Sequence, residues 1–422
     1  MAALQKPKLF ETRRSLFLAM GLLLLLFAAR LLVQYHSYTT LISKPFYYTY
    51  VDVITAYSKQ SGRRSYQVLK VYSDEGWRFY TTTHRKEDLS HTRLRLQIFP
   101  DASITFVDYL GNFYLKSRIK EVTPVADDTK TVLSKYVENQ HTNPEMSTFY
   151  RAIFFAMPLS MELRKKISKL GVSHLVALSG FHLTILWGLL YGVLWLFYRL
   201  LQQRYFPYRY ALMDVGGVVI LLLGAYVWFV GAPPSLIRSY AMVLLGWGML
   251  LLGLRLLSFE FLFVVFALLL ALFPSLSVSL SFWLSVAGVF YIFLLLHYTQ
   301  KLHKYWISFA VLPFGIFVLM LPIVHSLFGT TTECQLLSPL LSLLFVPFYP
   351  LVMLLHLVGQ GDLLDPVLQG LFALECPAHE SLLSWWAVAG YVGLSLAATR
   401  YRWAFYGLLG AALSYAIYLF VL

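Results

Sequence analysis

The chain has 422 residues, of which 58% are hydrophobic and only 13% are charged. This composition lies far from that of an ordinary soluble domain and predicts a protein with several membrane-spanning helices. The formal net charge is +13. Because Lys and Arg near the ends of spans stay on the cytoplasmic side of a membrane, the positions of these charges predict the orientation of each span.

The chain starts with basic residues ahead of its first apolar segment, namely Lys6, Lys8, Arg13 and Arg14. Residues 15–33 follow and are long enough to cross the hydrocarbon core. Because no small-residue cleavage pattern follows them, we expect an uncleaved anchor. Residues 1–34 are predicted to form a cytoplasmic tail and the first transmembrane helix.

Residues 35–126 have a different pattern from the rest of the chain. Segments that alternate between polar and apolar residues are separated by turn-forming residues, at 47–54, 66–72, 77–80 and 94–98. This period of two predicts short β-strands, and the length suits one small barrel. We therefore expect a small β-barrel domain outside the membrane.

Basic and aromatic residues are interleaved in this domain. The basic ones are Arg63, Arg64, Lys70, Arg78, Arg85, Lys86, Arg93 and Arg95, and the aromatic ones include Tyr66, Tyr72, Trp77, Phe79 and Tyr80. Cations bind phosphates and flat rings stack on bases, so this pattern predicts a surface for single-stranded nucleic acid. We assign that role to Arg63, Arg64, Lys70, Trp77 and Arg78. An ordinary solvated strand face with aromatic core residues is the alternative.

Residues 127–171 are predicted to connect this domain to the membrane through amphipathic helices. In the last of these helices, Ser160 is a suitable N-cap and Gly171 a suitable stop. Lys165 and Lys166 would lie on its polar face, on the outer surface of the membrane. They are expected to bind either lipid head groups or a polyanion.

Residues 172–422 contain the remaining spans. Apolar segments predicted to be spans lie at 172–201, 215–230, 235–254, 259–273, 276–297, 306–324 and 405–422. The loops predicted to be cytoplasmic each contain Lys or Arg, which supports this orientation. Residues 338–359 are long enough to cross, but Pro347 and Pro350 divide them and favour a re-entrant hairpin over a span.

Cys334 and Cys376 are the only cysteines. Arg400 and Arg402 are predicted to be cytoplasmic, so the span before them starts outside, which also places residues 360–383 outside. Both cysteines would then share an oxidising compartment and could form a disulfide. Two unrelated buried thiols are the alternative.

Polar residues stand out at the start of the second span, where His174, Ser179, Gly180 and His182 occur in an apolar stretch. In hydrocarbon, such groups need partners or face a wet cavity, and a Ser-Gly pair favours a break in the helix. The motif therefore predicts a channel lining. The alternative is that the Ser and His side chains cap backbone groups inside a helix bundle.

Two further spans contain candidate channel residues. Ser235 and Arg238 lie in the first turn of one of them, where the helix dipole is already positive. A cation there predicts a bound anion such as a phosphate, with a snorkelling interfacial Arg as the alternative. Ser281 and Ser285 share a face of a later span. They are expected either to form hydrogen bonds between helices or to line a water-filled pore.

The sequence GVSHLVALSGFH at residues 171–182 resembles the signature of the ComEC family of competence proteins, the DNA-uptake channels of naturally transformable bacteria. Further matches occur in the family's order at residues 231–239 and 282–285, and from Pro322 through 328–329 and Ser338 to Pro347. The family also places a small OB-like domain before its channel.

Departures from the family pattern limit what the resemblance implies. Ser338 stands where the family has Asn, and Phe181 replaces a Leu. Longer members continue into a metallo-β-lactamase-like domain, whereas residues 405–422 are apolar and show no His and Asp cluster for a metal. We therefore expect a short form with no catalytic residues, no metal and no cofactor.

The resemblance implies translocation of single-stranded DNA across the bacterial cytoplasmic membrane during natural transformation, with this chain as the channel. It also implies an extracytoplasmic DNA receptor and a separate nuclease. No phosphate-binding loop occurs, so a cytoplasmic motor or single-strand-binding proteins must supply the driving force. The alternatives are a secondary transporter of a small or lipid-linked solute with an outer cap, and a membrane enzyme that uses His174 and His182.

Overall fold

The computed structural model describes residues 10, 12–61, 64–85, 87, 89, 92–101, 103–124, 128–251 and 258–421. The chain divides into two compact units. The first, here the sheet unit, comprises Thr12–Asp128 and Phe266–Leu280. The second, here the helical unit, comprises the described residues of Thr129–Val265 and Ser281–Leu422.

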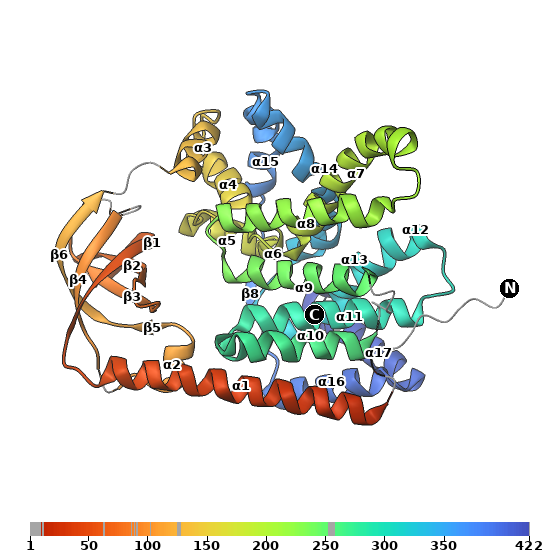
Figure 1. Ribbon diagram of the computed structural model, residues 1–422, viewed down its shortest axis with the longest axis horizontal. Coiled ribbons are helices and arrows are strands. Elements are labelled where there is room, and N and C mark those ends of the chain that lie inside the picture. Colours follow the sequence, from red (N-terminus) through yellow and green to blue (C-terminus); the bar gives the residue numbers. More distant parts are fainter. Residues whose placement is uncertain are drawn as a thin grey trace. The chain divides into compact units, whose positions relative to one another are not determined.

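The sheet unit begins with the long apolar helix α1 (Arg13–Ile42), whose N-cap Thr12 accepts a hydrogen bond from the backbone N–H of Ser15. Its strands are β1 (Tyr47–Ser61), β2 (Arg64–Ser73), β3 (Arg78–Thr83), β4 (Thr92–Phe99), β5 (Phe113–Tyr114) and β6 (Lys116–Pro124). A short helix, α2 (Phe106–Leu110), precedes β5. The four segments with a period of two therefore form strands, as predicted (Figure 1).

The strands form one six-stranded sheet in the order β5-β3-β2-β1-β4-β6. Its two edge strands, β5 and β6, are separated only by Leu115, whose N–H still donates to the carbonyl of Tyr80 on β3. Across the gap, the hydroxyls of Thr81 on β3 and Ser117 on β6 lie 2.7 Å apart. In the described residues no strand pairing joins β6 to β5 or to β3, so the predicted closed barrel is not found.

Alternation along the strands separates an apolar face from a polar one. Val51, Leu69, Phe79, Leu94 and Leu96 are buried on the inner face and form the core of the sheet unit. The neighbouring residues in each strand point to the other face, which is largely exposed.

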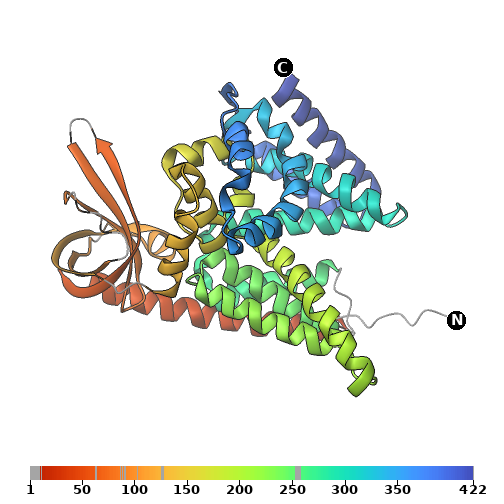
Figure 2. The same ribbon diagram turned by 90° about the horizontal axis from the view of Figure 1, so that it is seen from above.

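The helices of the rest of the chain are α3 (Thr129–Glu138), α4 (Pro144–Phe155), α5 (Met161–Lys169), α6 (Ser173–Val176), α7 (Gly180–Tyr205), α8 (Ala211–Phe229), α9 (Pro234–Leu251), α10 (Phe259–Leu272), α11 (Leu280–Tyr298), α12 (Lys304–Trp306), α13 (Leu312–Val324), α14 (Ser338–Leu357), α15 (Asp365–Phe372), α16 (Trp385–Ala398) and α17 (Arg402–Val421). Two short strands, β7 (Thr330–Thr332) and β8 (Ala378–Glu380), pair antiparallel. Helices α7 and α8 lie side by side (Figure 2).

Among the described residues, seven helical segments are long and apolar enough to cross a membrane: Arg14–Ile42, Gly180–Tyr205, Ala211–Phe229, Leu280–Tyr298, Lys304–Val324, Glu333–Leu357 and Arg402–Val421. Shorter apolar helices occupy Ser235–Leu251, Phe259–Leu272 and Trp385–Ala398. The protein is therefore mostly helical, passes the membrane several times and has a small sheet domain near its amino terminus.

Helix α14 corrects one prediction. The two prolines do not divide it, because Pro347 and Pro350 both lie inside one helix that runs from Ser338 to Leu357. Its buried residues, which include Phe345, Tyr349 and Val352, pack into the core of the helical unit. Neighbouring helices can hold a proline-containing span in helical form, and this packing keeps the backbone together where local sequence alone favours a hairpin.

Candidate functional site

The predicted polar motif folds as a helix, a break and a second helix. Helix α6 ends at Val176, and Ala177 and Ser179 have extended backbones before α7 begins at Gly180. The hydroxyl of Ser179 accepts a hydrogen bond from the N–H of Phe181 over 3.3 Å. The Ser-Gly pair therefore ends one helix and starts the next, and Ser179 is the N-cap.

His182 completes this cap. Its Nδ1 accepts a hydrogen bond from the backbone N–H of Ser179 over 3.3 Å, so a neutral ring has its proton on Nε2. The side chain is fully buried, and its Nε2 has no hydrogen-bond partner among the described residues. The rings of Phe345 and Tyr349 lie 5.1 and 4.9 Å from the imidazole. In this conformation His182 shapes the start of α7 from within an apolar core.

His174 and Gly171 are attached to the first turns of α14. Nε2 of His174 lies 3.3 Å from the hydroxyl of Ser342. The hydroxyl of Ser338 donates to the carbonyl of Gly171 over 3.1 Å. Gly171 has φ +67°, and a Cβ there would lie 3.2 Å from the side chain of Gln335. Ser338 thus holds the first residue of the motif.

The first turn of α9 binds the break directly. The hydroxyl of Ser235 donates to the carbonyl of Leu178 over 2.8 Å, which satisfies a backbone acceptor that the break leaves open. A Cβ on Gly180 would lie 3.0 Å from the hydroxyl of Ser239, so the glycine permits this close approach. The structure therefore brings Ser179, Gly180 and Ser235 together.

Arg238 lies in the same turn of α9 and is only 6% exposed. Its guanidinium carbon is 5.8 Å from the centre of the Phe282 ring on α11. In the described part of the chain its Nε has no hydrogen-bond partner, and no carboxylate pairs with it. Beside Phe282, Ser281 is exposed and Ser285 is half-buried. A buried cation at the positive end of a helix is a favourable position for an anion.

A second set of charges lies on the exposed face of the sheet unit. We define the Arg–Tyr face as Tyr48, Tyr50, Tyr72, Arg78, Arg93 and Arg95. The guanidinium of Arg95 lies 5.8 Å from the ring of Tyr50, which is its cross-strand partner. Arg78 lies 5.3 Å from the ring of Tyr72, again directly opposite. Arg93 also forms an ion pair of 2.6 Å with Asp74.

This face changes the assignment made from the sequence. Trp77 is 8% exposed and packs against Tyr47 in the core, so it is a core residue and not a stacking surface. Nζ of Lys70 lies 5.6 Å from the Tyr80 ring, and burial, followed by the charge of Arg78, lowers its pKa. Arg63 lies outside the described residues. Arg64 begins β2, and the structure describes its backbone.

Tyr48 and Tyr50 were missed in the sequence although a signal was present. The two tyrosines are two positions apart on β1, so they lie on the same face of the sheet. Pairing β1 with the alternating basic residues of β4 would have identified them. Register between strands is what brings the rings and the cations together.

On α5, the predicted N-cap Ser160 accepts from the N–H of Leu163 over 3.3 Å. The two lysines on this helix differ in their surroundings. Lys165 is exposed, whereas Nζ of Lys166 donates to both carboxylate oxygens of Glu145 on α4 at 2.8 Å. Lys166 therefore joins two helices, and its charge is already paired.

Cys334 and Cys376 form a disulfide with a Cα–Cα distance of 6.1 Å. They flank α14 and α15 in the sequence, next to the strand pair β7 and β8. The disulfide thus closes a loop that contains both helices.

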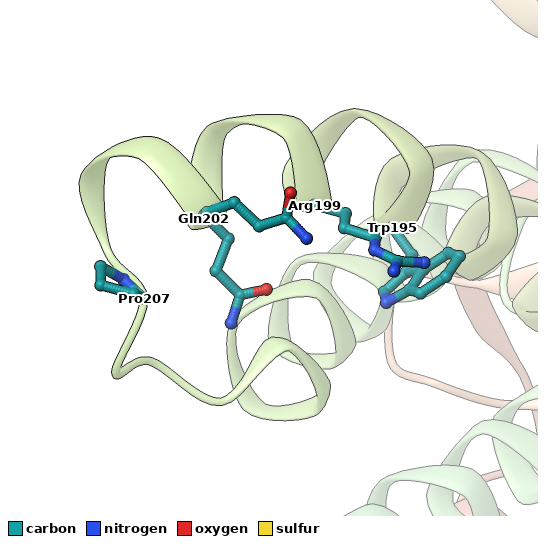
Figure 3. Close-up of a pocket in the computed structure, with 5 residues that line it drawn as sticks. Trp195, Arg199, Gln202 and Pro207 are labelled. Atoms are coloured by element: carbon teal, nitrogen blue, oxygen red, sulfur yellow. The ribbon is translucent and has the colours of Figure 1, made fainter.

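A separate open hollow of about 370 Å³ lies at the carboxyl end of α7, away from the motif (Figure 3). It is lined by Trp195, Arg199, Gln202, Gln203 and Pro207. The guanidinium of Arg199 lies 5.2 Å from the Trp195 ring. Among the described residues, no group of three or more His, Cys, Asp or Glu side chains is placed to hold a metal ion.

A family model described as Competence protein matches residues 157–422. No curated protein and no solved structure gives a significant match to the chain. The matched range contains the motif at the start of α7, Arg238 and the disulfide, and it excludes the strands of the sheet unit.

Proposed function

Because the chain belongs to the competence protein family, we propose that it is the channel through which single-stranded DNA crosses the bacterial cytoplasmic membrane during natural transformation. The family supports a role in DNA uptake, and the apolar helices support a protein that spans the membrane several times. In this proposal the chain makes and breaks no covalent bond.

The observation that most supports this proposal is the environment of Arg238. A phosphate in hydrocarbon is costly, on the order of 2.5–17 kcal/mol by analogy with buried charged side chains, so its path must offer compensating charge. One buried guanidinium at a helix amino terminus supplies positive potential without the dense cationic lining that would trap a polyanion. Arg238, Ser281 and Ser285 are the residues we place along the path.

The residues of the motif have two different roles in this proposal. His174 is exposed and is proposed to line the path. Ser179, Gly180 and His182 instead set the geometry of the break, since each is engaged in the cap or in the contact with α9. Ser235 ties α9, and with it Arg238, to that break.

The Arg–Tyr face is proposed to bind single-stranded DNA outside the membrane, as an OB-like domain would. Exposed rings suit bases, and the guanidinium groups beside them suit phosphates. Lys165 on the exposed side of α5 adds a further positive charge. We infer that a DNA receptor delivers the strand and that a separate nuclease prepares it.

The orientation proposed for the chain follows the basic residues and the disulfide. The amino terminus lies in the cytoplasm, and Cys334 and Cys376 lie on the oxidising side, where a disulfide is stable. Because the two cysteines are bonded to each other, the chain returns after α14 to the side on which that helix begins. A cytoplasmic motor or single-strand-binding proteins draw the strand inward.

Gene deletion tests the proposal. Cells without this chain are expected to keep labelled DNA at the cell surface and to import none into the cytoplasm, and a plasmid copy restores import. Normal import in the deletion strain contradicts the channel assignment.

A secondary transporter of a small or lipid-linked solute is the alternative proposal. It is favoured by one observation, the buried carboxylate of Asp365 beside His141, because buried titratable groups are typical of proton-coupled transporters. Unimpaired DNA import together with loss of a solute would support this alternative.

A further inference from the structure

Three titratable side chains form a buried hydrogen-bonded row in the helical unit. Oδ2 of Asp365 lies 2.8 Å from Nδ1 of His141, and Nε2 of His141 lies 3.0 Å from Nε2 of His356. Nδ1 of His356 lies 2.6 Å from the carbonyl oxygen of Val352. The row joins the loop between α3 and α4, the last turn of α14 and the start of α15 (Figure 1).

Each contact in the row needs one proton, and the atoms involved determine where those protons sit. A carbonyl oxygen only accepts, so Nδ1 of His356 has a proton and a neutral His356 accepts at Nε2. His141 must then donate from Nε2. The third proton lies between Nδ1 of His141 and the carboxyl of Asp365, and either arrangement leaves the row with no net charge.

The row is therefore both complete and uncharged at only one proton count. A proton added to His356 places N–H groups of His141 and His356 against each other and leaves a buried positive charge. A lost proton leaves one contact without a hydrogen: either the two Nε2 lone pairs of His141 and His356 face each other, or the Nδ1 lone pair of His141 faces the Asp365 carboxylate. In both cases a buried negative charge remains. Both changes are unfavourable, because an uncompensated charge in a protein interior is strongly destabilising.

The surroundings leave little to compensate such a charge. The Tyr150 ring stacks on His141 with 4.6 Å between ring centres, and Phe154 lies 5.0 Å from His356. Oδ1 of Asp365 and the hydroxyl of Tyr150 are buried without a partner among the described residues. Burial raises the pKa of Asp365, against the hydrogen bond from His141.

The other charged groups nearby are few. Asp362 lies on the segment before α15 and also raises the pKa of Asp365. Glu138 on α3 forms an ion pair of 3.0 Å with Arg151 on α4.

Neutral contacts complete the connection. The side-chain N–H of Gln140 donates to the carbonyl of His356 over 3.0 Å, and its oxygen accepts from the N–H of Gly361 over 2.9 Å. The turn after α3 thus binds both sides of the connection between α14 and α15.

We propose that Asp365, His141 and His356 form a proton-controlled latch that holds α14 and α15 against α3 and α4 and opens when the row gains or loses one proton. The other end of α14 holds Gly171 and His174 through Ser338 and Ser342. Release of the latch therefore frees the helix that supports the motif. The inference does not depend on the proposed DNA channel, because it concerns the attachment of two helices.

Hydrogen–deuterium exchange of the full chain in lipid nanodiscs, from about pH 5 to about pH 9, tests the latch. After correction for intrinsic rates, amides in residues 139–143 and 357–365 are expected to be most protected near neutral pH. Exchange at least about tenfold faster is expected at both extremes. A flat profile overturns the proposal.

Two substitutions separate the two sides of this profile. Asp365→Asn can donate to Nδ1 of His141 and cannot ionise, so it completes the row without a removable proton and abolishes the alkaline opening only. His356→Gln accepts from His141 and takes no proton, so it abolishes the acid opening only. His303→Gln, at an exposed histidine, is the control and keeps the full profile.

A merely structural role for the three residues gives a different result. Either variant would then lose protection equally at every pH, and that result overturns the latch. If one variant fails to fold, the other still tests its own side of the profile. DNA import is measured separately, so failure of the latch and failure of the proposed channel remain distinguishable.

Discussion

The hydroxyl of Ser235 donates to the carbonyl of Leu178 across 2.8 Å, and this bond attaches the first turn of α9 to the break between α6 and α7. It therefore positions Arg238 relative to the motif.

Ser235→Ala removes this bond and leaves the Leu178 carbonyl unsatisfied. We expect the free energy of unfolding to fall by about 1–3 kcal/mol, the usual penalty for a buried acceptor without a partner. Thermal unfolding of the purified protein in detergent measures the change. Ser281→Ala, at an exposed serine on α11, is the control, and equal losses in the two variants would contradict the assignment.

Arg238→Ala is expected to lower import of labelled DNA about ten- to a hundredfold, as loss of a hydrogen bond to a charged group would. Arg238→Lys keeps the charge but lacks the planar set of donors, so it restores only part of the import. Immunoblots confirm equal protein levels. Arg209→Ala is the control, because Arg209 is paired with Asp214, and normal import in both Arg238 variants would refute the path through α9.

Gly180→Ala is expected to destabilise the protein by about 1–3 kcal/mol, because the new Cβ lies 3.0 Å from the Ser239 hydroxyl. Ser239→Ala in the same chain removes that hydroxyl and is expected to restore part of the loss. Thermal unfolding of the single and double variants tests this coupling. Additive losses would show that the two residues do not interact.

Tyr50→Ala and Arg95→Ala are each expected to weaken binding of single-stranded DNA to the full chain by about 1–3 kcal/mol, because stacking is lost. Arg95→Ala is also expected to make the binding constant depend less steeply on salt concentration, because one phosphate contact is lost. Trp77→Ala instead lowers the stability of the sheet unit by about 3–5 kcal/mol, since it empties a core position. Fluorescence anisotropy at several salt concentrations gives the affinities. Tyr208→Ala, at an exposed aromatic in the helical unit, is the control, and an equal loss of binding in it would contradict the Arg–Tyr face.

Reduction of the bond between Cys334 and Cys376 is expected to cost about 4 kcal/mol, because these residues are 42 positions apart and the crosslink restricts the unfolded chain. Melting with and without a reductant measures this cost. The Cys334→Ser and Cys376→Ser double variant melts at the lower temperature and no longer responds to reductant. A wild-type protein that is indifferent to reductant would contradict the prediction.

Some features of the fold and site could be predicted from short stretches of sequence. Composition indicates the membrane spans, a period of two indicates the strands, and the pair Ser179 and Gly180 indicates a break in a helix. Each depends on neighbouring residues along the chain, because propensity, capping and amphipathic period are local properties.

Other features required the tertiary structure, since they depend on which faces pack together. Trp77 has the same local pattern as a stacking residue and lies in the core, and the prolines of α14 remain in one helix because other helices hold it. His141 meets His356 across 215 positions of sequence and Asp365 across 224. The sequence by itself thus determined that this chain crosses a membrane, carries a small sheet and breaks a helix at its motif. Only long-range packing decided which of its polar groups are buried together, because no local period records a contact between distant segments.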